Sequence, residues 1–257
     1  MHKIVCIGAG KLASQLMPTL EHAGYEVVQI YSRTSLHSNA LAGQLKNAQA
    51  TNDLSLIQAG ADVYFFALRD DAMEAVANEL GYLENSKSIF VHTSGILPLA
   101  AIPFKRRGIF YPLQTFSPNH AVDWKQTPIL VTGENEEINS SLQVMASKIS
   151  NLVYKVGDQD RAALHVAAVF ANNFTNHMLT LAEKICEEHH VSFEILKPII
   201  RETIEKALET GPANSQTGPA VRGDQQTIDK HLQMLNADPK MRELYLMITQ
   251  SIIRNTK

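Results

Sequence analysis

The chain has 257 residues, 45% of them hydrophobic, and a formal net charge of −3. This length can bury one large core or two modest ones, and the weak charge gives no sign of a nucleic-acid or membrane partner. No stretch approaches the length of a membrane span, and we expect no signal peptide because the first predicted strand begins at residue 3. The two cysteines, Cys6 and Cys186, show no metal or redox spacing, so we expect a cytoplasmic protein without a metal site.

The chain opens on a short apolar stretch and a glycine-rich turn. Residues 3–7 read as a buried strand, G-A-G-K-L-A follows at 8–13, and residues 12–22 read as a helix. This order is typical of the first turn of a dinucleotide-binding fold, in which glycines admit a pyrophosphate and helix N–H groups receive its charge. The alternative is a strand–helix turn that binds nothing. The predicted cofactor-binding residues of this turn are Gly8, Ala9, Gly10, Lys11 and Leu12.

The end of the second predicted strand, residues 26–31, indicates which dinucleotide binds. Sites that prefer NAD place Asp or Glu there to bind the ribose 2′-OH. In this chain the strand is followed by Ser32, Arg33 and Thr34. A hydroxyl beside a guanidinium suits a 2′-phosphate, because Arg offers a planar fork of donors to phosphate oxygens. We therefore predict NADP(H), the alternative being that Arg33 is only a solvated loop residue.

Alternating helix and strand signals continue to residue 156. The expected helices are 38–45, 54–58, 72–80 and 137–150, and the expected strands are 62–68, 88–92, 108–111, 128–132 and 152–156. The run 62–68 is apolar throughout, as in a parallel strand that is buried on both faces. These signals predict an α/β fold, with a doubly wound parallel Rossmann sheet in a dinucleotide-binding domain of residues 1–155.

Ligands of such sheets bind beyond the carboxyl ends of the strands. Ala67 and Leu68 end one predicted strand, Thr93 and Ser94 follow the next, and Gln114 lies in a loop bounded by two prolines. We predict that Ala67, Leu68 and Thr93 bind the cofactor. Ser94 is a candidate catalytic residue and Gln114 a candidate for binding the substrate. The alternative for Thr93 and Ser94 is that they only form a tight turn.

Strand signals then stop, so residues 156–257 are predicted to form an all-helical domain for substrate binding and dimerisation. One helix of about 30 residues is expected over 160–189, which lacks Gly and Pro. One of its faces carries apolar residues at helical spacing, namely Val166, Phe170, Phe174, Met178, Leu181 and Ile185. The first half of the opposite face carries Arg161, His165, Asn172 and Asn176. Neutral polar residues suggest that this face is partly covered by the cofactor cleft. A solvent-exposed face, or polar residues paired across a dimer interface, is an equally good interpretation.

A second helix is expected over 192–209, with a kink at Pro198. The stretch 211–224 then contains two Gly-Pro steps and reads as a rigid loop. Long loops in compact domains are usually functional or disordered, so this loop could deliver Thr217 and Arg222 to a substrate. The alternative is a purely structural turn. Two more helices are expected after it, over 225–235 and from Asp238-Pro239 onward.

Across nearly its whole length the chain resembles a group of reductases that includes β-hydroxyacid dehydrogenases, pyrroline-carboxylate reductases and ketopantoate reductases. More closely, it is similar to bacterial proteins that pair a Rossmann-like domain, related to deazaflavin-dependent NADP oxidoreductases, with a C-terminal domain of unknown function. The motifs that carry the resemblance are G-A-G-K-L-A at 8–13, H-T-S-G at 92–95, P-L-Q-T-F at 112–116, H-V-A-A-V-F-A-N-N at 165–173 and T-G-P-A-V-R-G-D at 217–224.

The resemblance implies an enzyme but leaves its proton donor open. Hydroxyacid dehydrogenases carry a catalytic Lys on the long helix, with an Asn one turn later, whereas this helix has no lysine before Lys184. His165 could serve instead, because imidazole can protonate the oxygen formed when hydride reaches a carbonyl. Asn172 lies two turns further on and is a second candidate catalytic residue. We expect an NADP(H)-dependent oxidoreductase of a small carbonyl or imine compound, such as a ketopantoate-like acid held by Arg222, with Asn176 and Thr217 as further substrate-binding candidates.

Two other classes of function remain open. The chain could be a nucleotide-sensing protein that has lost turnover, or a structural dimer whose helical domain recruits a partner. Convergence of His165, Asn172 and Arg222 on one cleft would favour the enzyme. A helical domain of about 100 residues has little apolar material to bury within its own chain, so we also expect a homodimer formed through this domain.

Overall fold

The computed structural model describes residues 3–85, 87–117 and 120–256. The chain divides into two compact units, Met1–Ala171 and Asn172–Lys257. The last strand of the sheet ends at Lys155, near the predicted domain boundary, but helix α5 (Asp158–Ala168) also belongs to the first unit. It does so because its first turns are hydrogen-bonded to loops of the sheet.

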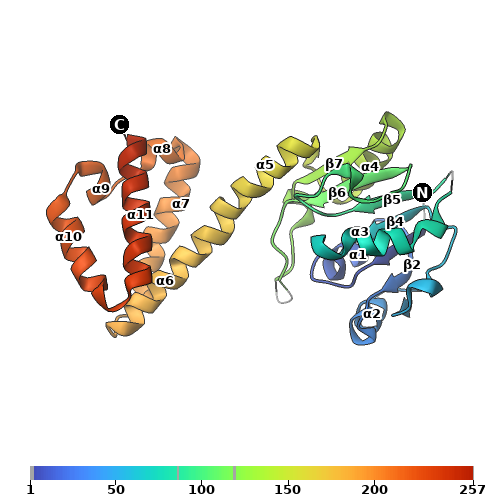
Figure 1. Ribbon diagram of the computed structural model, residues 1–257, viewed down its shortest axis with the longest axis horizontal. Coiled ribbons are helices and arrows are strands. Elements are labelled where there is room, and N and C mark those ends of the chain that lie inside the picture. Colours follow the sequence, from blue (N-terminus) through green and yellow to red (C-terminus); the bar gives the residue numbers. More distant parts are fainter. Residues whose placement is uncertain (1–2, 86, 118–119, 257) are drawn as a thin grey trace. The chain divides into compact units, whose positions relative to one another are not determined.

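The first unit is built on a single sheet (Figure 1). Its strands are β1 (Lys3–Ile7), β2 (Glu26–Tyr31), β3 (Gln49–Thr51), β4 (Val63–Phe66), β5 (Ile89–His92), β6 (Arg107–Pro112), β7 (Ile129–Gly133) and β8 (Val153–Lys155). Their order is β3-β2-β1-β4-β5-β6-β7-β8, and every pair is parallel except β6 with β7. This order confirms the predicted α/β class with a doubly wound Rossmann sheet.

Helices cover both faces of the sheet, which is why the central strands β1, β4 and β5 are buried at every position except Lys3. The helices are α1 (Ala13–His22), α2 (Ser35–Ala42), α3 (Asp70–Glu79) and α4 (Glu136–Ile149). Side chains of α1, α2 and α4 form one core layer and those of α3 form the other. In the second layer the Phe90 ring stacks on Phe104, with centroids 3.7 Å apart, and on Tyr64 at 5.0 Å. An aromatic pair at the Phe90–Tyr64 separation contributes beyond the area that it buries.

Several predicted boundaries in this unit need correction. Helix α2 begins at Ser35, three residues earlier than predicted, and the expected helix 54–58 is a 3₁₀ turn, Leu54–Leu56. Strand β3 was not predicted, because its three residues Q-A-T carry no apolar alternation and lie at the edge of the sheet. The other predicted strands and helices lie within a few residues of the observed ones.

The second unit is all helical, as predicted. Its helices are α6 (Thr175–Glu188), α7 (Lys197–Thr210), α8 (Pro212–Ser215), α9 (Pro219–Arg222), α10 (Gln225–Met234) and α11 (Pro239–Thr256). The predicted long helix is interrupted by a π-helical turn, Val169–Phe174, between α5 and α6. Pro198 does not kink α7, because it lies in the first turn, where its missing N–H costs no helical hydrogen bond. The predicted loop 211–224 contains two single-turn helices, each opened by a Gly-Pro step.

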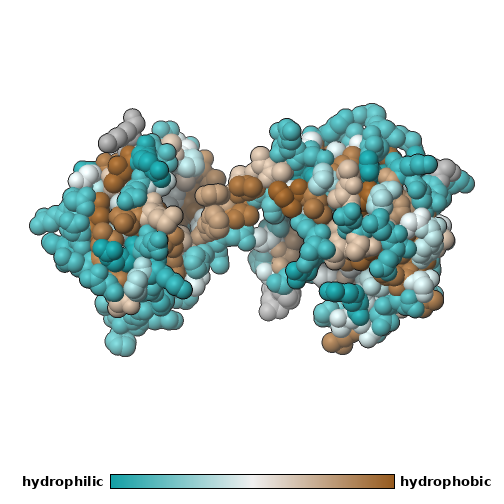
Figure 2. Space-filling view, in the orientation of Figure 1, coloured by the Kyte–Doolittle hydropathy of each residue, from teal (hydrophilic) through white to brown (hydrophobic). Residues whose placement is uncertain are grey.

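The second unit buries little of its own apolar surface. Of its described apolar residues, only Ile228 and Met241 are buried. In α7 every residue except Ile200 and Ala207 is exposed, and Leu208 is 82% exposed. Figure 2 shows brown apolar patches on the surface of this unit. Among the described residues of the whole chain, no helix has both the length and the apolar character that a membrane span requires.

Candidate functional site

The glycine-rich turn after β1 fits the backbone of a dinucleotide site. Gly8 has φ of +118°, and a Cβ there would collide with the carbonyl oxygen of Ala67 at the end of β4. At Gly10, by contrast, a Cβ would meet nothing within 4 Å, so a ligand can approach this backbone. Leu12 precedes α1 and offers no side-chain cap, which leaves the first N–H groups of the helix without that partner. A turn that packs closely on β4 and has an open backbone at Gly10, before the start of a helix, suits a pyrophosphate.

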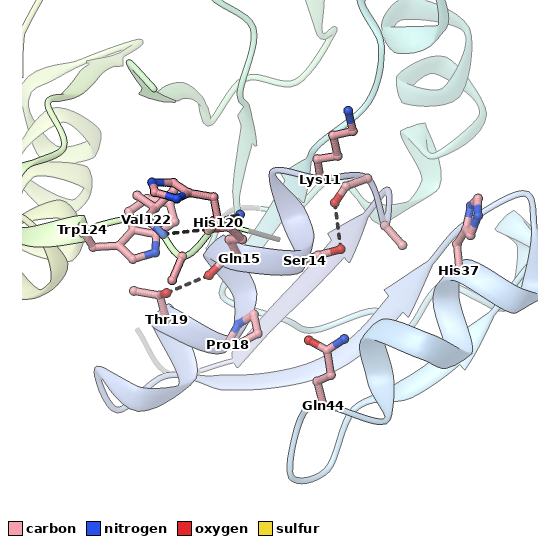
Figure 3. A pocket seen from close by; sticks show the side chains of 13 residues that line it. Lys11, Ser14, Gln15, Pro18, Thr19, His37, Gln44, His120, Val122 and Trp124 are labelled. Atoms are coloured by element: carbon pink, nitrogen blue, oxygen red, sulfur yellow. Dashed lines mark hydrogen bonds between the residues drawn. The ribbon is translucent and has the colours of Figure 1, made fainter. Parts of the chain in front are cut away.

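A cavity of about 970 Å³ opens beside this turn (Figure 3). Its wall includes Lys11, His37 and His120, and its described lining residues include no carboxylate. Figure 3 shows Lys11 and Ser14 at the start of α1, with His37 on α2. Gln15 on α1 fixes the opposite wall, because its amide donates to the carbonyl oxygen of His120 at 3.2 Å. The cavity therefore suits an anionic ligand better than a cationic one.

The backbone ladder brings the predicted cofactor residues to one edge of the sheet. The Gly8 N–H donates to Tyr31 O at 2.8 Å, and Ser32 follows directly at the end of β2. The Ala67 N–H donates to Ile7 O at 2.8 Å, and the Thr93 N–H donates to Phe66 O at 3.3 Å. The turns after β2, β1, β4 and β5 are therefore neighbours. Leu68 also contacts this turn, since its side chain is among the nearest atoms to the position of a Gly8 Cβ.

The segment after β2 has room for a phosphate. Ser32 is half-buried, and its Oγ accepts the N–H of Thr34 at 3.4 Å. Arg33 and Thr34 are exposed, and Thr34 occupies the N-cap position of α2. No Asp or Glu lies between the end of β2 and the first turn of α2. A guanidinium therefore lies beside the start of a helix, where anions are favoured.

A buried histidine organises the turn after β5. The His92 side chain is fully buried; its Nε2 donates to Pro98 O at 3.2 Å, and its Nδ1 accepts the Ser94 N–H at 3.3 Å. Burial, with a smaller contribution from the Arg161 charge, lowers the pKa of His92 from 6.5 to about 4. The imidazole is therefore neutral at physiological pH and carries its proton on Nε2. The two hydrogen bonds of His92 therefore hold the backbone of residues 94–98 in this turn.

Ser94 is tied into the same turn. Its side chain is buried, and its Oγ accepts the N–H groups of Ile96 at 3.2 Å and Leu97 at 3.0 Å. Its hydroxyl hydrogen is the atom that remains for a ligand, because both of these contacts use the oxygen. This geometry is compatible with both interpretations of Ser94, as a residue that only forms a tight turn and as a residue of the active site.

An ion pair fastens the start of α5 to this turn. Arg161 is fully buried; its Nη1 donates to Asp158 at 2.9 Å, and its Nη2 donates to Leu97 O. The Asp158 carboxylate in turn accepts the Leu99 N–H, at 3.0 and 3.2 Å. Arg161 therefore lies inside the structure and not on a cleft wall, although the sequence placed it on the same face as His165.

The anchored helix brings His165 against the sheet. The phenol oxygen of Tyr111, in β6, lies 2.9 Å from Nδ1 of His165. A Cβ at Gly95 would come within 2.6 Å of that same nitrogen and within 2.8 Å of Cζ of Tyr111. Only a glycine at position 95 lets the two rings meet. His165 is half-buried, and its Nε2 lies on the side of the ring away from Tyr111.

Sequence reasoning missed Tyr111, although it precedes Pro112 at the end of β6, where ligands of parallel sheets bind. Burial, the largest cause, raises the pKa of Tyr111, so the group is a neutral phenol at physiological pH. Gln114 is exposed in the loop after β6, and its Oε1 accepts the Thr115 N–H at 2.8 Å. His165 and Tyr111 thus form a polar pair that packs against Gly95 in the turn after β5.

The remaining predicted residues belong to the second unit. Asn172 is exposed in the π-helical turn, and Asn176 is exposed in the first turn of α6. Thr217 lines an apolar cavity of about 320 Å³ between α6, α9 and α11. Arg222 is exposed at the end of α9. Their convergence with His165 stays a prediction.

Two family models match the chain, and the second match begins within the first unit, just before β7. A family model described as NADP oxidoreductase coenzyme F420-dependent matches residues 3–94, and one described as Domain of unknown function (DUF2520) matches residues 127–252. The comparison with curated proteins gave no match.

Solved structures resemble the chain over its full length. A Bacteroides fragilis protein provisionally described as an NADP oxidoreductase is 37% identical, with a TM-score of 0.91 over 98% of both chains. Protein TM1727 from Thermotoga maritima is 21% identical, with a TM-score of 0.73 over 98% of both chains. An imine reductase variant from Myxococcus stipitatus, in complex with NAD⁺, is 14% identical, with a TM-score of 0.64 over all of both chains. The last two show the fold alone. The chain belongs to the oxidoreductase family in which a domain of the F420-dependent NADP oxidoreductase type precedes a DUF2520 domain.

Proposed function

We propose that this protein is an NADP(H)-dependent oxidoreductase that transfers hydride to or from a small carbonyl or imine compound, a ketopantoate-like acid being one candidate. The observation that carries the proposal is the position of His165, which the Arg161 anchor and Gly95 hold beside the turn that follows β5. That turn neighbours the glycine-rich turn in the sheet. A titratable group thus lies close to the edge where this fold binds its cofactor.

The residues that would hold the cofactor are those of the sheet edge. Gly8 to Leu12 would bind the pyrophosphate through backbone N–H groups, and Ser32, Arg33 and Thr34 would bind the 2′-phosphate. Ala67, Leu68 and Thr93 would flank the dinucleotide at the ends of β4 and β5. When bound, the nicotinamide supplies the hydride.

The protein's own contribution would be proton transfer and orientation. His165 would give a proton from Nε2 to the carbonyl oxygen or imine nitrogen whose carbon receives the hydride, and would recover it from solvent. Ser94 would orient that group by a hydrogen bond, and Gln114 would bind another part of the substrate. Asn172, Asn176, Thr217 and Arg222 of the second unit remain candidates from the sequence, with Arg222 suited to an anionic group.

The test is turnover with NADPH against 2-oxo acids, β-keto acids and cyclic imines, followed by the loss of NADPH absorbance. The imine reductase among the similar structures motivates this panel. Deazaflavin F420 is a second hydride carrier to include, because it is named in the description of the N-terminal family model. Tight NADPH binding without turnover of any compound would favour a nucleotide-sensing protein instead.

We also propose that the helical unit pairs with a second copy of the chain. Four apolar residues of α7 recur at helical spacing, Ile200, Ile204, Ala207 and Leu208, and Glu202, Glu205 and Glu209 lie on the other side of the helix. The exposed large apolar side chains of α7 are Ile199, Ile204 and Leu208, which are 62%, 47% and 82% exposed. A second copy of the chain is the partner that is always present in equal amounts, so it is the occupant that we propose for this helix.

A further inference from the structure

We propose that Tyr111 is a positioning residue that makes Nε2 the only nitrogen of His165 able to exchange a proton with the substrate. This inference rests on the proposed function, in which His165 is the proton donor. The phenol oxygen of Tyr111 lies 2.9 Å from Nδ1, so that nitrogen is already in a hydrogen bond. Tyr111 belongs to β6 and His165 to α5, and 54 residues separate them in the chain.

Close packing and a hydrogen bond together determine the orientation of the His165 ring. A side chain at position 95 would overlap both Nδ1 and the Tyr111 ring, so the Nδ1 edge of the imidazole lies directly over the Gly95 backbone. The Tyr111 and His165 rings meet edge to face, with centroids 5.9 Å apart. A flipped ring would place carbon where Nδ1 now lies and would lose the hydrogen bond to the phenol. Gly95 leaves space for the ring, and the hydrogen bond to Tyr111 selects the orientation in which Nε2 points away from both residues.

The direction of the hydrogen bond follows from the chemistry of a proton donor. A histidine that gives up a proton does so as imidazolium, in which both nitrogens carry hydrogen. In that state Nδ1–H can only donate, so the phenol oxygen of Tyr111 accepts. When Nε2 has given its proton to the substrate, the neutral ring keeps hydrogen on Nδ1 and the same bond remains. The transfer then needs no rearrangement around the ring, which is the advantage of a preorganised site.

Tyr111 suits this role because it stays neutral. Burial raises its pKa, with a smaller opposing effect from the Arg161 charge. A phenolate beside His165 would hold the imidazolium proton too strongly to release it, whereas a neutral phenol oxygen is a modest acceptor. Its own O–H remains free to donate to water, because the contact with His165 uses only the oxygen.

The decisive measurement is the tautomer of neutral His165, read from ¹⁵N chemical shifts of the whole protein above the titration range of the ring. His165→Gln assigns the signal among the ten histidines. We expect the Nδ1–H tautomer to predominate in the wild type and Tyr111→Phe to shift the ring toward the Nε2–H form. Tyr154→Phe, in strand β8, makes the same chemical change elsewhere in the sheet and should leave the signal unchanged.

A second variant, at position 95, disturbs the same Tyr111–His165 contact without altering either residue. Gly95→Ala should push the ring off Tyr111 and shift the tautomer in the same direction, which matters if Tyr111→Phe does not fold. Where turnover is found, Tyr111→Phe should lower kcat by about 3- to 10-fold, the worth of one hydrogen bond, with KM nearly unchanged. A wild-type ring that is mainly Nε2–H, or one that neither variant alters, overturns the role of Tyr111 whether or not the protein proves to be an oxidoreductase. Absence of turnover with the expected tautomer would instead count against the proposed function.

Discussion

The Asp158 carboxylate accepts the backbone N–H of Leu99, with both oxygens within 3.2 Å of the nitrogen. This contact joins two segments 59 residues apart, the start of α5 and the turn after β5. Arg161 completes it by donating to Asp158 and to Leu97 O from a fully buried position. The position of His165, one turn further along α5, therefore depends on an ion pair that contacts no ligand.

Replacing Arg161 by Met keeps most of the stem volume but removes both charged hydrogen bonds. We expect a loss of about 2–3 kcal/mol in the free energy of unfolding, because Leu97 O and the Asp158 carboxylate lose their donor. Exchange of the Leu99 amide should also become faster. Urea unfolding and hydrogen exchange measure the two effects.

The chain offers a matched control in an exposed Arg–Asp pair, Arg69 with Asp71. Its side chains are 81% and 63% exposed, so Arg69→Met should change the free energy of unfolding by less than about 0.5 kcal/mol. Equal losses in the two variants would show that the Arg161 pair does not anchor α5.

The fully buried His92 makes stability depend on pH. Its pKa is lowered to about 4 in the folded state and returns to about 6.5 on unfolding. Its contribution to stability is therefore fully present above pH 6.5. Between pH 6.5 and 4 only the unfolded chain binds this proton, so the free energy of unfolding should fall by about 1.4 kcal/mol per pH unit.

Urea unfolding at pH 7, 6 and 5 measures this slope. His92→Gln should flatten it, since glutamine keeps hydrogen-bonding groups but does not titrate. His37→Gln replaces an exposed histidine and should leave the slope as it is in the wild type. If His92→Gln retains the full pH dependence, another group is responsible for it.

The sequence predicts those features of this structure that depend on interactions between residues close together in the chain. The strand Glu26–Tyr31 was predicted to the residue because its apolar pattern is local, whereas β3 has no such pattern. The π-helical turn Val169–Phe174 contains no Gly or Pro, so the sequence pattern predicted one continuous α-helix through it. The glycine-rich turn and the H-T-S-G turn could both be found from the sequence because each is a short contiguous motif.

The polar pair shows where local reasoning stops. His165 was selected from its place on a helix face, but Tyr111 could not be paired with it from the sequence. Their contact depends on the position of β6 beside β5 and on the Arg161 anchor, which are properties of the whole fold. The need for glycine at position 95 becomes visible only once both rings are placed.

The cofactor proposal predicts that NADPH binds more tightly than NADH. Arg33 would contribute one charge-assisted contact to the 2′-phosphate, worth about 1.5–3 kcal/mol, or roughly 10- to 100-fold in affinity. Arg33→Ala should remove that preference while leaving the affinity for NADH unchanged. Fluorescence titration of both dinucleotides measures it, and Arg254→Ala in α11 controls for the loss of a positive charge. Equal affinities in the wild type would remove the basis for choosing NADP(H).

The role proposed for His165 predicts a separation of binding from turnover. His165→Ala should lower kcat by about 10²- to 10⁴-fold, the usual worth of a positioned general acid, with NADPH affinity within about 2-fold of the wild type. His189→Ala, at the exposed end of α6, should match the wild type in both measurements. A His165→Ala enzyme with full turnover would mean that another group supplies the proton.

The last prediction concerns assembly through α7. Light scattering of the wild type at tens of micromolar should give twice the mass of one chain, because the apolar stripe of α7 would be covered by the second copy. Leu208→Glu places a charge on that stripe, where the wild-type side chain is 82% exposed, and should yield monomers. Lys206→Glu introduces the same residue outside that stripe on the same helix and should remain dimeric. A monomeric wild type would contradict the proposal directly. A dimer that Leu208→Glu leaves intact would show that the two copies meet on a different surface, and α7 would then need another partner to cover it.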